Sequence, residues 1–431
     1  MKKTLLTICL VWMCFSLSAQ KIIDLSGKWS FSIDRQDNGE KEKWFSHTLN
    51  DFINLPGSMP EKLKGDEVTA KTQWTGSLYD SSYYYNPYME KYRKEGNIKF
   101  PFFLTPDKHY VGAAWYQKEV NIPADWKGER ILLFLERPHI ETTVWVNGQK
   151  TGMQNSLCVP HQYDITHYVR PGKCTITIRV DNRIKEINVG PDSHSITDQT
   201  QGNWNGIVGR ICLQTTPKTY FDDIQIYPEP EQKLARVKVV IKGTGTAKVK
   251  LSAESFNTDK KHIVPAIQQE IKLNKGVTET EMVLPMGNDM LLWDEFHPAL
   301  YKLKAEVTNG KKTEIKEIQF GMRRFEIKGK WFYVNGRKTQ LRGTVENCDF
   351  PLTGYAPMDV ESWERVFRIC RSYGLNHMRF HSFCPPEAAF IAADRVGFYL
   401  QPEGPSWPNH GPKLGLGQPI DKYLMDETIA L

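Results

Sequence analysis

The chain has 431 residues, of which 12% are aromatic, and its formal net charge at pH 7 is +6. Its Lys and Arg residues are scattered along the chain rather than clustered, which argues against a nucleic-acid-binding protein. After the N-terminal segment, no stretch is long and apolar enough to span a membrane. A chain of this length and composition is expected to form two or three domains, each with its own core.

The first nineteen residues have the pattern of a secretory signal peptide. Two lysines follow Met1, an apolar stretch runs from Leu5 to Phe15, and Leu17-Ser18-Ala19 offers a small residue for cleavage. The apolar stretch is too short for a membrane helix, and Cys9 and Cys14 lie inside it rather than after it, which disfavours a lipid anchor. We expect a signal peptide over residues 1–19 and export across the inner membrane to the periplasm or the exterior.

Six cysteines follow this segment. None belongs to a C-x-x-C pair or a metal-type cluster, so small buried thiols are expected, although an oxidising compartment would allow them to pair. They are Cys158, Cys174, Cys212, Cys348, Cys370 and Cys384.

Residues 20–218 are expected to form a β-sandwich of jelly-roll type. Several β-branched or aromatic runs are bounded by turn residues, and Asn147-Gly148 is a strong hairpin signal. No long helical period interrupts these runs, which favours a sandwich. They cover residues 130–136, 142–147 and 174–181. Residues 75–106, rich in Tyr, Pro and charge, are expected to be a long surface loop.

A second β region covers residues 219–322. Apolar and polar residues alternate with period two over residues 237–241, 247–252 and 301–307. About 100 residues with this pattern suit an immunoglobulin-like β-sandwich.

Strands and helices alternate over residues 323–431. A helix is expected from Asp359 to Tyr373, because Val360, Trp363 and Phe367 fall on one face. Further elements are expected as strands at 339–343, 376–381 and 398–401, and as helices at 386–396 and 421–431. This order predicts parallel βαβ units, the first three of a (β/α)₈ TIM barrel. A complete barrel takes roughly 250 residues, so this one is expected to be incomplete.

Several motifs along the chain together resemble glycoside hydrolase family 2. Those similar to its sugar-binding domain are Trp115-Tyr116, Val144 to Gly148, Tyr163 to Thr166, Arg179 to Asn182 and Gly202 to Arg210. Those similar to the end of its immunoglobulin-like domain and the entry to its barrel are Trp293 to Tyr301, Phe320 to Arg323, Asn335-Gly336 and Leu341 to Gly343. The resemblance covers nearly all of the chain after residue 19.

This resemblance implies a retaining exo-β-glycosidase, in a family that includes β-galactosidases, β-glucuronidases and β-mannosidases. Such chemistry needs two carboxylates about 5–5.5 Å apart, an acid/base and a nucleophile. In the family these are glutamates on the fourth strand, after an Asn, and on the seventh strand. The sequence has no Asn-Glu dipeptide. Both glutamates are therefore expected beyond Leu431, and the 431 residues alone are expected to be inactive.

The resemblance also implies a substrate-binding wall at the carboxyl ends of the strands. Arg379 matches the Arg of the family's Arg-x-Ser-His pattern, here with His and Ser exchanged, so His381 is a candidate sugar contact. Glu403 matches the second acid of the family's Asp-Glu pair and would bind sugar hydroxyls or Arg379. Trp407 and His410 would supply a stacking platform and a polar contact.

Each of three of these residues has an alternative role that is purely structural. In these alternatives Arg379 serves as a structural ion-pair partner of Glu403, His381 as a core histidine, and Trp407 as packing. The Asn-Arg-His-Glu run of many family members is replaced by Thr344 to Asp349, which weakens the case for a magnesium site, so no cofactor is expected.

A glycan or oligosaccharide substrate is the expected partner. The sequence does not indicate which terminal sugar is recognised or which oligomeric state the protein adopts. A secreted, non-catalytic carbohydrate-binding protein is the alternative function.

Overall fold

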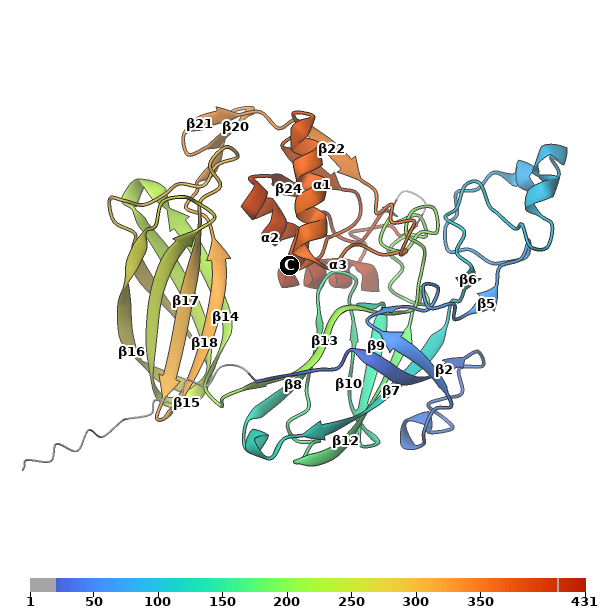
Figure 1. Cartoon of the computed structure of the whole chain (residues 1–431), viewed down its shortest axis with the longest axis horizontal. Helices are drawn as coiled ribbons and strands as arrows, with labels where there is room; N and C mark the ends of the chain where they lie inside the picture. The colour runs from blue at the N-terminus through green and yellow to red at the C-terminus, as the bar shows by residue number, and fades with distance from the viewer. Residues whose placement is uncertain (1–20, 409–410) are drawn as a thin grey trace, which may run out of the picture.

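The computed structural model describes residues 21–408 and 411–431 (Figure 1). The predicted signal peptide and His410 lie outside the described residues. Most of the regular secondary structure is β, arranged as two β-sandwiches and a smaller C-terminal segment with parallel strands and helices. No helix in the described ranges is long and apolar enough to cross a membrane.

The first sandwich packs two sheets around one large apolar core. One sheet has the order β1 (Ile22–Asp24), β13 (Gly206–Thr216), β8 (Arg130–His139) and β11 (His161–Asp164), with β4 (Gly57–Ser58) also paired to β13. The other has the order β10 (Gln149–Asn155), β9 (Glu141–Val146), β12 (Gly172–Asp181), β7 (Ala113–Ile122), β2 (Gly27–Asp34) and β3 (Asp51–Leu55). The predicted hairpin at Asn147-Gly148 is confirmed: both residues have positive φ and join β9 to β10.

Residues 75–106 are more than the surface loop that their composition predicts. They contain two 3₁₀ helices, η2 (Ser81–Tyr84) and η3 (Pro87–Tyr92). Tyr83, Phe100 and Phe103 are buried in an aromatic cluster of their own. The high aromatic content therefore gives this segment its own small core, because aromatic side chains bury large apolar areas.

The second sandwich is built on one long hairpin. Its strands are β14 (Tyr220–Glu229), β15 (Leu234–Phe256), β16 (Ile263–Pro285), β17 (Leu300–Asn309) and β18 (Lys312–Phe320). The runs 237–241 and 247–252 are two halves of β15, which pairs with β14 over its first half and with β17 over its second. A register shift at Gly243 and Gly245 bends the strand between them, since glycine tolerates the positive φ that both adopt.

The C-terminal α/β segment (residues 343–431) contains three parallel strands, β22 (Gly343–Glu346), β23 (His377–Phe380) and β24 (Tyr399–Gln401). Its helices are α1 (Val360–Ser372), α2 (Glu387–Val396) and α3 (Pro419–Ala430). Asp359 caps α1 by accepting the N–H of Ser362, and Trp363 and Phe367 bury the apolar face of the helix as its periodicity predicts.

The predicted strand at 339–343 is wrong in position. Thr339 instead ends β21 (Arg337–Thr339), which forms an antiparallel sheet with β19 (Phe325–Lys328) and β20 (Trp331–Val334). The parallel strand begins only at Gly343, where a Cβ atom would lie 2.4 Å from the ring of His377. A larger residue there would have to displace the His377 ring.

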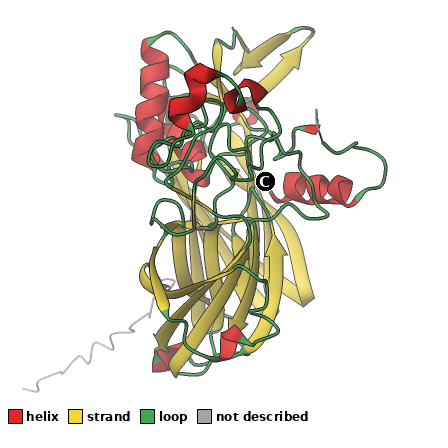
Figure 2. Cartoon of the chain, turned by 90° about the vertical axis from the view of Figure 1, so that its right-hand side faces the viewer, coloured by secondary structure: helices red, strands yellow, loops and turns green. Residues whose placement is uncertain are grey.

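The α/β segment packs against both sandwiches. In Figure 1 it lies, orange to red, across the upper end of the first sandwich, and in Figure 2 its helices lie beyond one end of the sandwich strands. Trp293 of the second sandwich is fully buried and donates its indole N–H to Asp394 O of α2, 2.7 Å away. On the other side, the Tyr423 hydroxyl of α3 accepts the N–H of Leu157 from the first sandwich.

Candidate functional site

The carboxyl ends of β22, β23 and β24 meet at one edge of the α/β segment, because the three strands are parallel. There, Arg379 Nε donates to Glu403 Oε1, and the Ser382 N–H donates to Glu403 Oε2 at 2.8 Å. Burial works to raise the pKa of Glu403, but these hydrogen bonds and the charge of Arg379 outweigh it and lower the pKa. Glu403 is therefore a carboxylate at neutral pH, held in one orientation by two donors.

Three aromatic rings lie beside this ion pair. The ring centroids of His381 and Trp407 are 4.9 Å apart. A third ring, His194, comes from the first sandwich and lies 4.3 Å from His381 and 5.5 Å from Trp407. The sequence analysis missed His194, since no motif marks it and its neighbours in space are nearly 200 residues away.

His194 is buried and neutral. Its Nδ1 lies 3.1 Å from the carbonyl oxygen of His381, and burial lowers its pKa to about 4. Because a carbonyl oxygen only accepts, the single proton of the neutral ring is on Nδ1, which leaves Nε2 as an acceptor. The ring is thereby fixed in both tautomer and orientation.

A loop of the first sandwich, which includes residues 189–194, forms hydrogen bonds with the backbone and side chains around the site. Ser193 Oγ donates to Pro405 O at 2.8 Å, and the His194 N–H donates to Ser382 Oγ at 2.9 Å. The backbone N–H of Trp407 donates to the carbonyl oxygen of the same loop at residue 189, at 3.0 Å. The site is therefore assembled from two parts of the chain that lie far apart in the sequence.

The end of β22 adds two acidic residues to the same edge. Glu346 Oε1 accepts the N–H of Asp349 at 3.2 Å, and the carbonyl oxygen of Glu346 accepts the N–H of His381 at 3.0 Å. Burial is the main cause that raises the pKa of both carboxyls. These two acids thus hold a proton more readily than Glu403 does. Within the described ranges, no group of three or more His, Cys, Asp or Glu residues is arranged to hold a metal ion.

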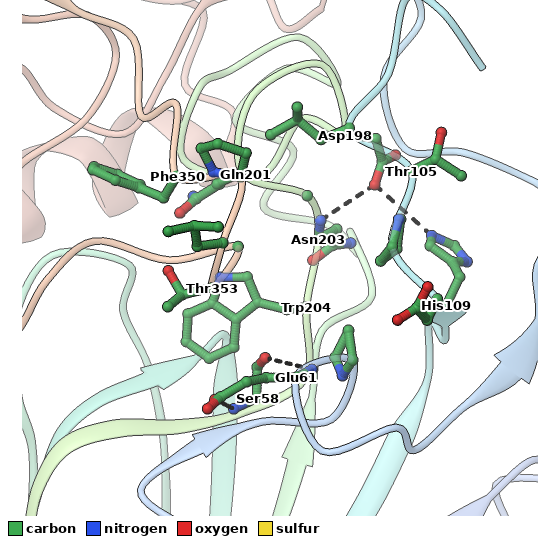
Figure 3. Close-up of a pocket in the computed structure, with 18 of the residues that line it drawn as sticks. Ser58, Glu61, Thr105, His109, Asp198, Gln201, Asn203, Trp204, Phe350 and Thr353 are labelled. Atoms are coloured by element: carbon green, nitrogen blue, oxygen red, sulfur yellow. Dashed lines mark hydrogen bonds and ion pairs between the residues drawn. The ribbon is translucent and has the colours of Figure 1, made fainter. Parts of the chain in front are cut away.

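A separate cavity of about 460 Å³ lies between the loop after β22 and three loops of the first sandwich (Figure 3). Trp204 lines it and stacks on His139, with ring centroids 4.5 Å apart. Glu61 and Asp198 add carboxyl groups to its wall. Neither Arg379 nor Glu403 lines this cavity, so it is distinct from the ion-pair site.

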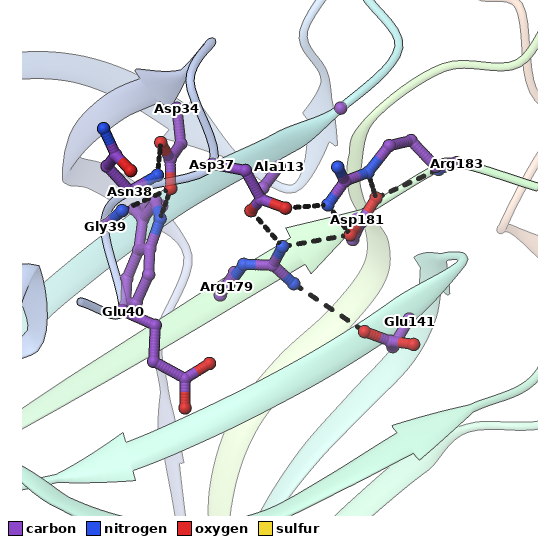
Figure 4. A network of polar contacts seen from close by, with 12 residues as sticks. Asp34, Asp37, Asn38, Gly39, Glu40, Ala113, Glu141, Arg179, Asp181 and Arg183 are labelled. Atoms are coloured by element: carbon purple, nitrogen blue, oxygen red, sulfur yellow. Dashed lines mark hydrogen bonds and ion pairs between the residues drawn. The ribbon is translucent and has the colours of Figure 1, made fainter. Parts of the chain in front are cut away.

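The family-like motif Arg179 to Asn182 has a structural role. Figure 4 shows the Arg179 guanidinium between Asp37, Asp181 and Glu141. The side chain of Asn182 donates to the carbonyl oxygens of Tyr110 and Asn203 and accepts the N–H of Gly112.

The motif thus ties β12 to the loop that precedes β7 and to the loop that carries His194. Its residues shape the support of the site rather than its surface.

Comparisons with known proteins identify the family to which the chain belongs. The family model described as "Glycosyl hydrolases family 2, sugar binding domain" matches residues 22–217, and the one described as "Glycosyl hydrolases family 2" matches residues 219–323. The chain belongs to glycoside hydrolase family 2. The sequence resemblance is therefore confirmed at the level of the family.

Its curated relatives in family 2 are glycosidases. The chain is 24% identical over 334 residues to a β-galactosidase of Thermoanaerobacter pseudethanolicus, covering 73% of this chain and 42% of that protein. It is 23% identical over 420 residues to the β-glucuronidase of Homo sapiens, covering 89% of this chain and 57% of that protein. The chain thus spans about half the length of these relatives.

Solved structures show the same fold. A β-glucuronidase from Ruminococcus gnavus, in complex with D-glucaro-d-lactam, superposes with a TM-score of 0.67 at 20% identity, covering 95% of this chain and 63% of that one. A family 2 member from Bacteroides cellulosilyticus gives a TM-score of 0.66 at 19% identity, covering 95% of this chain and 50% of that one.

Proposed function

We propose that this chain carries the substrate-binding wall of a family 2 exo-β-glycosidase, which removes a terminal sugar by a retaining mechanism. The observation that carries the proposal is the Arg379–Glu403 ion pair beside His381 and Trp407 at the carboxyl ends of parallel strands. Active sites of barrel enzymes lie at this end of the strands. The relatives named above support a glycosidase.

We infer a matching division of the chain. A signal peptide over residues 1–19 would direct export to the periplasm or the exterior. A jelly-roll domain would follow over 20–218, an immunoglobulin-like domain over 219–322, and the first three βα units of a TIM barrel over 323–431. The parallel pairing of β22, β23 and β24 supports the last assignment.

Glu403 is suited to bind sugar hydroxyls rather than to act as a general acid. A general acid needs a raised pKa, whereas the pKa of Glu403 is lowered. Each carboxylate oxygen accepts one hydrogen bond from the protein and has a further lone pair for a hydroxyl. Arg379 uses its Nε in the pair, so its other nitrogens add donors at the same place.

The rings would bind the apolar face of the sugar. Trp407 is half-buried, so part of its indole face is accessible to a ligand, and His381 is also half-buried beside it. His194 is buried behind both rings and would hold them in place. The site would therefore combine a stacking surface with a charged acceptor, which is the chemistry that recognises a sugar.

The experiment is calorimetric titration of the 431-residue protein with the methyl β-glycosides of galactose, glucuronic acid and mannose. We expect saturable binding of at least one of them, weakened at least about tenfold by Glu403→Gln, because a charge-assisted hydrogen bond is lost. The matched control is Glu119→Gln, which changes an exposed acid on β7 and should leave binding unchanged.

The second measurement is hydrolysis of aryl β-glycosides. We expect the 431-residue protein to show no turnover above background. Efficient hydrolysis would contradict a purely substrate-binding role for Glu403. Saturable binding that survives Glu403→Gln would favour the second candidate function, non-catalytic carbohydrate binding. The cavity lined by Trp204 is the observation that favours this alternative.

A further inference from the structure

Two cysteines from distant parts of the chain meet where the α/β segment packs on the first sandwich. Cys158 lies in the loop between β10 and β11, and Cys384 lies in the loop between β23 and α2. Both are at least nine-tenths buried and belong to one apolar cluster, which α3 also joins. Neither residue takes part in the proposed sugar site.

The two thiols contact each other directly. Their side chains are hydrogen-bonded to each other. A hydrogen-bonded thiol pair places the sulfur atoms close together before any covalent bond forms. Because the thiolate is the reactive form of cysteine, either residue can attack once it has lost its proton.

The backbone on both sides is also held in place. Nη1 of Arg137 donates to Leu157 O at 2.5 Å and to Cys384 O at 3.2 Å, so one nitrogen bridges the two segments. The Cys158 N–H donates to Glu427 Oε2 of α3 at 3.0 Å. A disulfide requires closely spaced backbones, and these hydrogen bonds hold the two segments next to each other.

We propose that Cys158 and Cys384 form a disulfide that joins the first sandwich to the α/β segment. The oxidant is a small-molecule or protein disulfide of the compartment into which the chain is exported, so the inference rests on the predicted export. It is independent of the sugar-binding role of Glu403.

The bond forms by two thiol–disulfide exchanges. The thiolate of one of the two cysteines attacks one sulfur of the oxidant, which breaks the oxidant's S–S bond and releases one thiol. The thiolate of the other cysteine then attacks the protein sulfur of the mixed disulfide and releases the second thiol. The two protein thiols lose two protons and two electrons in total, and the oxidant is reduced to two thiols. Because both sulfurs are buried in the docked state, the exchange takes place before the interface closes or while it is open.

The bond would stabilise the candidate site. Cys384 lies two residues after Ser382, whose N–H and hydroxyl hold Glu403 and His194. Joining it to the first sandwich closes a very long loop, and long loops gain the most from a crosslink in the chain-entropy description. The disulfide should therefore fix the corner at which both parts of the site meet.

The test starts with the wild-type protein, folded in a buffer of oxidised and reduced glutathione. The protein is denatured, its free thiols are alkylated, and its peptides are examined by mass spectrometry before and after reduction. Of the six cysteines that follow the signal peptide, we expect four to be alkylated before reduction. One peptide pair should link Cys158 to Cys384, with two hydrogens fewer than the separate peptides.

Variants supply the second readout. Cys158→Ser and Cys384→Ser should each lower Tm under oxidising conditions by several degrees more than under reducing conditions, and the double variant should lose little more than either alone. Cys370→Ser, a half-buried cysteine on α1, is the control and should show no redox-dependent difference. Six alkylated thiols in the wild-type protein, or a link to another cysteine, would overturn the proposal.

Discussion

The charge network at the end of β12 gives the sharpest stability prediction. Asp181 is fully buried, and its carboxylate accepts from Arg183 Nη2 at 2.6 Å, from Lys185 Nζ at 2.9 Å and from Arg179 Nη2 at 3.0 Å. Burial works to raise the pKa of Asp181, but the hydrogen bonds from Arg183 and Lys185 and the charge of Arg179 outweigh it and hold the pKa well below its usual range.

The perturbation is Asp181→Asn, which keeps the shape of the side chain and removes its charge. Arg179, whose side chain is 9% exposed, would then depend on Asp37 and on the more distant Glu141. Because Arg179 keeps Asp37 as a partner, the cost is the loss of charge-assisted hydrogen bonds, about 1.5–3 kcal/mol. We expect the free energy of unfolding of the first sandwich to fall by this amount.

The assay is urea unfolding at pH 7, followed by pulsed hydrogen exchange of the peptide that contains β12. Glu119→Gln is the matched control on the same sheet: its ion pair with Lys173 has side chains 59% and 80% exposed, so its loss should cost less than about 1 kcal/mol. Equal effects of the two substitutions would refute the reasoning.

The wild-type protein and Asp181→Asn should also differ in how their stability depends on pH. Since the pKa of Asp181 is lowered by folding, its contribution is fully present above the ordinary value of 3.8 and is lost as the pH falls further. The difference between wild type and Asp181→Asn should therefore be constant from pH 7 to 5 and shrink below about pH 4.

Three further predictions concern the contacts around the candidate site. Gly190→Ala would place a Cβ 2.2 Å from Trp407 O, so it should destabilise the protein and weaken glycoside binding. The control Gly148→Ala has a similar positive φ but open space around it, so it should cost only about 1 kcal/mol and affect binding less. The wild-type protein should lose stability as the pH falls from 6.5 to about 4, because burial keeps the folded His194 ring neutral while the unfolded chain takes up the proton. His194→Gln should lose less stability over this range, and an equal dependence of the urea midpoint on pH in both proteins would contradict this. Tyr423→Phe leaves a buried backbone N–H without its acceptor, so protease cleavage within α3 should be faster, for a cost of about 1–3 kcal/mol.

Local patterns in the sequence predicted much of the fold. The apolar period of 359–373 predicted α1, and the turn at Asn147-Gly148 predicted the hairpin of β9 and β10. These signals are local, because helix faces, caps and tight turns involve residues a few positions apart. The boundary at Gly343 was missed, because β22 begins where its pairing with β23 begins, and that strand lies further along the chain.

The candidate site was predicted only on the side that belongs to the α/β segment. The family resemblance indicated Arg379, His381 and Glu403, and the structure brings the first and last into an ion pair. Whether this pair binds sugar stays a prediction. His194 completes the site from a loop nearly 200 residues earlier, and no local pattern marks that loop as its support.

The sequence by itself determined the family, the order of the β and α/β regions and several strands and helices, because these follow from periodicity, turn chemistry and motif order. Tertiary structure decided that Arg179 and Asp181 form a buried support, that His194 lies against Trp407, and that Cys158 meets Cys384. The last two contacts depend on how the sandwich and the α/β segment dock. Docking is governed by surface complementarity between segments far apart in the chain, which leaves no periodic signal in the sequence.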